Sequence, residues 1–506
     1  MKTKSFALVL NLVLLSALIL SACSATPTPT ATTAPAATAV PAATTAPAAT
    51  TAPAATVAPT TAAAGLPAII SFPKQIAGGK PVSITVVQKP ADSNPTGVAA
   101  WYLQVARFEK MYPNVTITGT DYAYDPASFA ALVAGNQVPT LFEVYLTDPS
   151  QMIDQGIATD LTSFIKDQKL DSVFNPSILN IAEKDGKYYG IPRFAYAMGL
   201  AYNIKMLKAA GFDSAPTTWD QLATMAQKLT DRNAGVAGFS FITDGTGAAG
   251  WHLTTLAYNF GLKNDQIVTQ SGSKYTENFA TGPLLDTLNY IHDLRWKYDV
   301  LPLENLAWDT NGAALANGTA AMVVMAGDQF TWLRQTYPDA PIADFGFAPL
   351  PAGGTDGKGV SLVGGNIAMV SSKATPDQVE AAVYWRLFTQ FDPNEIISNY
   401  IAGQSDTTVV VGAPELPLYV GDYETATEAL EAKYANLPIA NYKSFMDAIS
   451  SGKVGLQAEP LVKGQDFYTA VATVLSSVVT DQTADPAALL KTAADTFQTN
   501  VLDQIK

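Results

Sequence analysis

Aromatic and polar side chains lie together at several points along the chain where predicted strands end. Tyr122 and Tyr124 follow one predicted strand, Tyr145 follows the next strand beside Glu143, and Trp251 begins a predicted helix. Flat aromatic faces pack against the C–H face of a sugar ring, and planar polar groups bind its hydroxyls. Any one of these aromatic residues is more simply explained as part of the core, so none of them predicts a binding site by itself.

A glycine-rich segment has the pattern of a dinucleotide-binding loop. Gly245 to Gly250 reads G-x-G-x-x-G between a predicted strand and a predicted helix. No acidic residue ends a following strand about 20 residues on, and Asp265 comes too early, in a predicted loop. The segment also lies in the middle of its predicted domain. We therefore favour a loop in which helix N–H groups face ligand oxygens.

Residue types typical of catalysis and metal binding are sparse. The only histidines are His252 and His292, the only cysteine is Cys23, and the sequence has neither an H-x-x-x-H spacing nor a G-x-S-x-G motif. The 44 acidic residues always offer carboxylate pairs in space, as a glycoside hydrolase needs. No pattern marks one of them as a general acid. We therefore expect no catalytic residue, no metal and no cofactor.

The composition is that of a large soluble chain with an acidic surface. The 506 residues are 48% apolar and 15% charged, with a formal net charge of −14. This length allows two or three domains of ordinary size. An acidic protein repels phosphate backbones, which argues against nucleic-acid binding and against a basic patch for anionic lipids.

The first 23 residues have the pattern of an export signal. Lys2 and Lys4 precede an apolar run, Phe6 to Leu20, which is shorter than the roughly 20 residues of a membrane span. The run ends in Leu-Ser-Ala-Cys, which resembles the lipobox of bacterial lipoproteins. We expect acylation of Cys23 and anchoring through the acyl chains; an ordinary signal peptide with an incidental cysteine is the alternative.

Residues 24–65 are a low-complexity segment of Ala, Thr and Pro without charge. The segment cannot bury a core, and its prolines favour an extended chain that reaches on the order of 130 Å. It is expected to be a disordered linker.

The folded part follows, and strands near 82–88, 115–118 and 141–146 alternate with helices near 98–112 and 125–135. This alternation predicts an α/β fold with parallel strands flanked by helices.

One stretch, Tyr188 to Thr230, closely resembles the extracellular solute-binding proteins of ABC importers (family 1, the sugar-binding lipoprotein type). It matches the Y-G-I-P turn, the strand ending in Y-N, the A-G that closes a short helix, and the T-W-D-x-L that opens the next one. Only Gln221, in place of the usual Glu, departs. Phe108–Ile117 and Ala314–Leu333 resemble further stretches of the family, but the family's tryptophan in the second of these is Gln329 or Phe330 here.

The resemblance implies a two-lobed periplasmic-binding-protein-like fold with mixed, mainly parallel sheets and a ligand cleft between the lobes. Relatives place a hinge near Arg193–Ala197. The expected domains are a signal peptide and linker as above, lobe 1 from residues 66–195 and 319–370, and lobe 2 from residues 196–318 and 371–506, the last part being helical.

The function implied by the resemblance is that of the lipid-anchored solute-binding component of an ABC importer. Such a protein would act as a monomer outside the cytoplasm, at the cell surface or in a periplasm. It would capture a mono- or oligosaccharide by lobe closure and deliver it to a membrane permease. An extracellular carbohydrate-active enzyme and a sensor-accessory lipoprotein are the alternatives.

Ligands in open α/β sheets lie beyond the carboxyl ends of strands. We combine that rule with the implied hinge and with the ligand contact that family members make from the start of the penultimate long helix. Together these criteria select the following ligand-binding residues: Asp92, Asp121, Tyr122, Glu143, Tyr145, Arg193, Tyr196, Trp251, Gln329, Asn366 and Asp466.

Overall fold

The computed structural model describes residues 66–353, 358–406 and 409–505. The expected signal peptide, the lipid attachment at Cys23 and the expected linker all lie outside these residues. In the part of the chain that the structure describes, no helix is both long enough and apolar enough to span a membrane.

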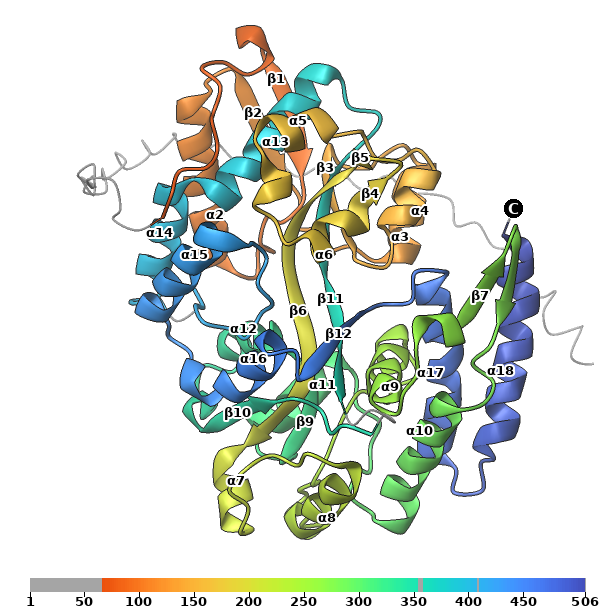
Figure 1. Ribbon diagram of the computed structural model, residues 1–506. Coiled ribbons are helices and arrows are strands. Elements are labelled where there is room, and N and C mark those ends of the chain that lie inside the picture. The colour runs from red at the N-terminus through yellow and green to blue at the C-terminus, as the bar shows by residue number, and fades with distance from the viewer. Residues whose placement is uncertain (1–65, 354–357, 407–408, 506) are drawn as a thin grey trace, which may run out of the picture. The chain divides into compact units, whose positions relative to one another are not determined.

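Two long strands organise the fold (Figure 1). β6 (Gly190–Asn203) and β11 (Gly359–Val370) pair antiparallel, from Val363 opposite Ala197 to Met369 opposite Gly190. The pairing shifts in the middle, because Asn366 lies opposite Phe194 while Ile367 lies opposite Pro192. Arg193 is therefore an extra residue on β6, a bulge that redirects its side chain.

At one end, the long strands join a set of parallel strands. β3 (Leu141–Tyr145) pairs antiparallel with the second half of β11, and β1 (Val82–Val86) lies between β3 and β2 (Val115–Gly119). β1 and β2 share a first hydrophobic core with four helices, which are α2 (Pro95–Met111), α13 (Pro376–Phe391), α14 (Pro393–Ala402) and α15 (Gly421–Tyr434).

At the other end, the second half of β6 pairs antiparallel with β9 (Met322–Ala326) and β10 (Phe345–Ala348), and β12 (Val454–Ala458) pairs parallel with the first half of β11. A second core joins this end of β6 to α8 (Trp219–Leu229), α9 (Gly247–Asn259), α10 (Pro283–His292), α17 (Gly464–Thr480) and α18 (Pro486–Asn500). A third core links both ends through apolar residues of β3, β6, β9 and β10, with α11 (Trp308–Ala316), α12 (Gln329–Thr336) and α16 (Lys443–Ser450).

The remaining elements are short and lie mainly in the connections. They are α3 (Pro126–Ala134), α4 (Pro149–Asp154), α5 (Thr162–Asp167), α6 (Pro176–Leu179), α7 (Ile204–Ala209), β4 (Glu183–Lys184), β5 (Lys187–Tyr188), β7 (Val268–Ser271) and β8 (Lys274–Glu277).

Local sequence signals explain why several elements begin and end where they do. The Thr218 side chain accepts a hydrogen bond from the backbone N–H of Gln221 and caps α8, as expected from T-W-D. Asn203 ends β6 and caps α7 in the same way. Gly250, in the glycine-rich segment, lies against the backbone of Tyr468, where a β-carbon would overlap the carbonyl. This glycine therefore allows α9 and α17 to pack closely.

Several expectations about secondary structure and domain limits need correction. The predicted turn at Gly190–Pro192 is part of β6, because the ladder to β11 continues through it. The strand predicted at 237–243 makes only isolated bridges at Ala237 and Ser240. Antiparallel pairings outnumber parallel ones four to three in the large sheet of the described residues, since β6 and β11 run in opposite directions through both ends.

The cores also differ from the expected division into lobes. α13, α14 and α15 pack in the core of β1 and β2, although residues 371–506 were expected to complete the other lobe. β9 and β10, expected in lobe 1, pair with the second half of β6. The boundary expected at residue 370 therefore does not separate the cores, because the apolar residues of α13 face β1.

Candidate functional site

A tyrosine from the loop after β2 and the last residue of β3, also a tyrosine, pack together beside a buried carboxyl. The rings of Tyr124 and Tyr145 meet edge to face with centroids 5.0 Å apart. Tyr145 Oη donates to the carbonyl of Tyr124 at 2.9 Å, and Tyr124 Oη donates to Oδ2 of Asp148 at 2.9 Å. Asp148 is 8% exposed. These bonds fix one carboxylate and two aromatic faces relative to each other.

Aromatic residues from the other end of the long strands lie close to this group. Tyr196 on β6 packs edge to face against Trp251 on α9, with centroids 6.1 Å apart, and Trp251 lies 5.9 Å from Trp308. Glu459, which follows β12, is 6% exposed and accepts a hydrogen bond from Tyr468 Oη at 3.3 Å. We call Tyr124, Tyr145, Asp148, Tyr196, Trp251, Glu459 and Tyr468 the aromatic–acid cluster.

A direct hydrogen bond joins the two sides of the cluster. Gln465, at the start of α17, donates from Nε2 to Oγ1 of Thr147 at 3.1 Å. Thr147 directly precedes Asp148, and Gln465 lies three residues before Tyr468. The start of α17 is thereby held against the loop after β3.

Burial sets the charge state of both acids in the cluster. Burial raises the pKa of Asp148 to about 6, although hydrogen bonds from Tyr124 and Thr147 lower it. Burial and the nearby charge of Asp148 raise the pKa of Glu459 to about 8. A carboxyl that is protonated near neutral pH can donate one hydrogen bond and accept others. The cluster therefore offers both donors and acceptors next to apolar ring faces.

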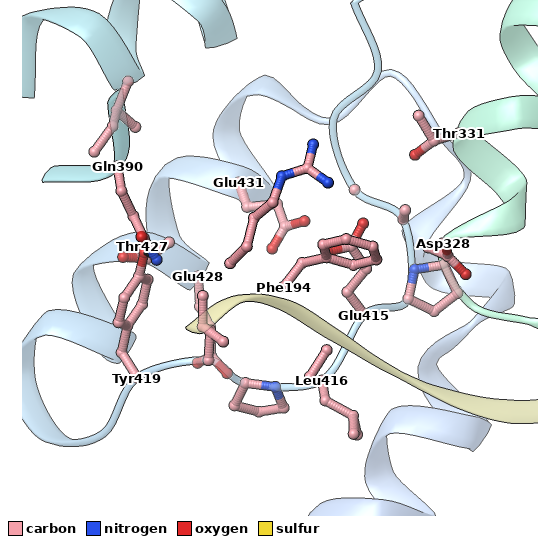
Figure 2. Close-up of a pocket in the computed structure, with 18 of the residues that line it drawn as sticks. Phe194, Asp328, Thr331, Gln390, Glu415, Leu416, Tyr419, Thr427, Glu428 and Glu431 are labelled. Atoms are coloured by element: carbon pink, nitrogen blue, oxygen red, sulfur yellow. Dashed lines mark hydrogen bonds between the residues drawn. The ribbon is translucent and has the colours of Figure 1, made fainter. Parts of the chain in front are cut away.

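A cavity of about 870 Å³ lies next to this cluster, because the ring of its lining residue Phe194 is 5.7 Å from the ring of Tyr196. It is lined by residues of α12, α13, α14 and α15 and by the segment 412–419, and we call it the α12–α15 cavity. Figure 2 shows Asp328, Glu415 and Glu431 around the ring of Phe194 in this cavity. Of the residues selected from the sequence, only Arg193 lines it.

A large part of the sequence matches a known protein family. The model of the bacterial extracellular solute-binding proteins matches residues 91–385, which is more than half of the chain. The chain belongs to this family.

Individual relatives of this solute-binding protein are distant. The arabinooligosaccharide-binding protein of Halalkalibacterium halodurans is 27% identical over 184 residues, which are 36% of this chain and 37% of that protein. An ABC transporter solute-binding protein from Thermotoga lettingae, solved with α-D-tagatose, has a TM-score of 0.64 at 18% identity and covers 82% of this chain and 98% of its own. UgpB from Mycobacterium tuberculosis, solved with glycerophosphocholine, has a TM-score of 0.64 at 18% identity. The match covers 84% of this chain and 99% of UgpB.

These likenesses confirm the predicted fold class. The solute-binding protein has the two-lobed α/β fold of the periplasmic binding proteins, with a mixed sheet flanked by helices. The switch of β6 from β11 to β9 as its neighbour falls between Ala197 and Met198. That position directly follows the stretch Arg193–Ala197, where the resemblance implies a hinge.

The structure brings some of the selected residues of the solute-binding protein together. Tyr145, Tyr196 and Trp251 are members of the aromatic–acid cluster. Asp466, beside Gln465 at the start of α17, is close enough for its negative charge to raise the pKa of Asp148. Tyr122 lies next to the cluster, where its hydroxyl is 3.1 Å from the Ser128 hydroxyl.

The other selected residues lie elsewhere. Asp92 is exposed and binds Lys89 at 2.6 Å, and Asp121 is exposed. Gln329 is buried and accepts from the backbone N–H of Ala326 at 2.8 Å, so it ties α12 to β9. Asn366 is a ladder position of β11. Glu143 and Arg193 form an ion pair at 3.3 Å.

Sequence reasoning missed five residues of this region. Asp148 and Thr147 could have been found by the rule that selected Tyr145, because they follow the same strand. Glu459, Gln465 and Tyr468 gave no comparable signal. The strand before Glu459 is short, partly exposed and was not predicted.

Proposed function

We propose that this solute-binding protein captures a mono- or oligosaccharide at the aromatic–acid cluster and delivers it to the permease of an ABC importer. The observation that carries this proposal is the packing of Tyr145, Tyr196 and Trp251 beside the carboxyls of Asp148 and Glu459. Ring faces and hydroxyl-binding groups are the two components that a sugar requires. The similarity to an arabinooligosaccharide-binding protein and to a tagatose-bound structure supports the same class.

Lobe closure is the proposed means of capture. A ligand shifts a two-state equilibrium only by its difference in affinity for the two states. The bond between Gln465 and Thr147 forms only when the start of α17 and the loop after β3 are together. A sugar that contacts residues on both sides would add to this contact and favour the closed state.

Lipid anchoring at Cys23 completes the proposal. The run Leu20 to Cys23 supports acylation, and the Ala/Thr/Pro-rich linker would let the folded part reach its permease from the outer face of the membrane. In this setting the protein would act as a monomer without a cofactor.

The test is a thermal-shift screen of about fifty sugars with the full chain in detergent, followed by mass spectrometry of each sugar that raises the melting temperature. A raised melting temperature with an unaltered sugar is expected. Trp251→Ala should abolish the shift. Trp296→Ala is the matched control, since this half-buried tryptophan bonds Val478 on α17 and is not part of the cluster; it should keep the shift.

A different outcome would favour catalysis instead. The pKa of about 8 for Glu459 is one that a general acid needs. Release of a shortened sugar that depends on Glu459 would replace the binding proposal with the carbohydrate-active enzyme. The absence of a shift with any sugar in the screen would remove the sugar as the ligand class.

A further inference from the structure

The α12–α15 cavity carries a marked excess of acidic groups. Its lining includes one carboxyl from the start of α12, one from the segment beside β6 and three from α15, which are Asp328, Glu415, Glu424, Glu428 and Glu431. Arg193 on β6 and Arg386 on α13 are the only basic residues in the described lining. The formal charge of the lining is therefore −3.

The two arginines are already engaged by another carboxylate. Glu143 on β3 is 7% exposed and forms an ion pair with Arg193 at 3.3 Å, and its charge also acts on Arg386. None of the five cavity carboxyls forms an ion pair with Lys or Arg in the described residues. Arg193 acts only in part on the cavity acids, because its charge opposes the increase in the pKa of Asp328 and Glu415 while it is also paired with Glu143.

Buried polar atoms without partners also line the cavity. Arg386 Nε, Gln390 Oε1 and Tyr423 Oη have no hydrogen-bond partner in the described residues, and these side chains are 5%, 8% and 4% exposed. Gln390 is held in place because its Nε2 donates to the carbonyl of Pro192 at 3.0 Å and to Tyr419 Oη at 3.1 Å. Leaving such atoms unpaired costs about 1–3 kcal/mol each. Gln390 Oε1 and Tyr423 Oη can accept hydrogen bonds, so a ligand that donates to them would be stabilised, whereas Arg386 Nε needs an acceptor.

The arrangement of the acids favours an organic cation over a metal ion. The described residues contain no group of three or more His, Cys, Asp or Glu placed to hold a metal ion. The carboxyls instead are distributed around a volume of about 870 Å³. Phe194, Trp332, Tyr400 and Tyr419 supply aromatic faces in the same lining, and such faces attract ammonium groups.

We propose that the α12–α15 cavity is a second binding site, which takes a small linear organic cation with two or more amino groups. Each ammonium group donates three hydrogen bonds and accepts none, which matches a lining rich in carboxylate and amide oxygens. Above about pH 8, where the acids are ionised, the net negative lining disfavours anions. A neutral polyol would leave the carboxylates without a balancing charge.

The charge states of the cavity acids support this proposal. Burial raises the pKa of Glu415 to about 8, with a further increase from the charge of Asp328. Burial likewise raises the pKa of Asp328, Glu424 and Glu431 to about 7. The positive charge of Arg193 acts against the increase at Asp328 and Glu415. A bound dication would lower all of these pKa values and release protons.

The test is isothermal titration of the full chain in detergent with hexamethylenediamine, and with hexanediol as the neutral control of equal length. The diamine should bind, and the diol should bind at least about 100-fold more weakly because charge-assisted bonds are the stronger ones. Binding near pH 8.5 should exceed binding near pH 6 by about tenfold or more, with proton release, because the acids ionise in that interval. Equal binding of diamine and diol, or no binding of the diamine, would overturn the proposal.

Variants locate the site. Glu415→Gln and Glu431→Gln should each weaken diamine binding by about tenfold, which is the effect of losing one charge-assisted bond. Glu304→Gln, at an exposed acid outside the lining, should leave it unchanged, and circular dichroism checks that each variant folds. Trp251→Ala should also leave it unchanged, because Trp251 belongs to the aromatic–acid cluster. Loss of diamine binding in Trp251→Ala would place the amine in that cluster and refute the second site.

Discussion

The ring of Tyr196 on β6 packs directly against Gly364 on β11. A β-carbon at Gly364 would lie 2.7 Å from Cζ of this ring, which is closer than atoms of neighbouring side chains approach. The next residue, Gly365, has φ of 149° and lies against the backbone of Phe194 and Ala195. The two glycines therefore allow the long strands to pass closely where the hinge is predicted, with the ring of Tyr196 packed against Gly364.

Gly365→Ala is expected to destabilise the fold by more than about 2 kcal/mol. The new β-carbon would overlap the carbonyl of Phe194 and come within 2.9 Å of the Cα of Ala195, and alanine at a positive φ is strained. Chemical denaturation measures the loss. Gly455→Ala on β12 is the matched control, because its β-carbon would meet only one atom, the carbonyl oxygen of Gly359, at 3.9 Å. Equal stabilities of the two variants would contradict the close packing of β6 against β11 at Gly365.

Gln465→Ala is expected to weaken sugar binding about fivefold without lowering the melting temperature of the free protein. The variant loses the bond to Thr147, which stabilises only the closed arrangement, and one such bond contributes about 1 kcal/mol. Titration calorimetry with a sugar from the screen measures the change. Thr473→Ala, at an exposed position of the same helix, should bind as the parent does. A loss of stability without a loss of affinity would show that the bond is merely structural.

The sequence predicts most of the fold because local signals and tertiary contacts agree in it. Thr218 caps α8 where T-W-D predicts a helix start, and the apolar face Leu222–Leu229 is buried. The same reasoning fails at 237–243, where the apolar run predicts a strand. Its backbone N–H groups instead donate to the carbonyls of Thr319, Val300 and Met322. The spacing of apolar residues predicts that a segment is buried, and this segment is buried. It does not predict whether a neighbouring strand is present to complete a β-ladder.

The candidate site was predicted less completely than the fold. Rules about strand ends find Tyr145, which lies at a strand end, but they also select Asp92, which is exposed and bound to Lys89. Glu459 lies beside Trp251 because β12, which precedes it, pairs with β11 across a large sequence separation. The α12–α15 cavity gave no signal for the same reason. Its carboxyls come from segments that the fold alone brings together.

Arg107→Met is expected to destabilise the protein by about 3 kcal/mol. Glu395 on α14 is 1% exposed, and Arg107 on α2 donates to it from Nε at 2.8 Å. Removal of the arginine leaves a buried carboxylate without its partner, which typically costs 3–5 kcal/mol. Urea denaturation of the variant measures the cost. Adding Glu395→Gln should restore part of the stability, because the uncompensated charge is then gone; no restoration would show that the lost packing of Arg107 is responsible.

The free energy of unfolding is expected to fall as the pH rises from about 5 to about 8.5. Glu415, Glu424, Glu431, Asp328 and Glu459 have native pKa values raised to about 7 or 8, against roughly 4 in the unfolded chain. Between these values the native state binds more protons than the unfolded state, so stability decreases by about 1.4 kcal/mol per pH unit for each excess proton. Above the native values the decrease ends.

One buried group acts in the opposite direction and offsets one of the five excess protons below about pH 6.5. Burial lowers the pKa of His252 to about 3, so the unfolded chain binds a proton there below about pH 6.5 while the native state does not. Its effect is lost once the unfolded histidine is neutral, and the acids then act alone. Urea denaturation at several pH values should nevertheless give the steepest fall between about pH 5.5 and pH 6.5, where the five acids are still protonated in the native state but ionised in the unfolded chain, and the slope should decrease toward zero above about pH 8. Glu415→Gln should reduce that slope, whereas Glu304→Gln should not; an unchanged slope in Glu415→Gln would show that Glu415 is ionised throughout.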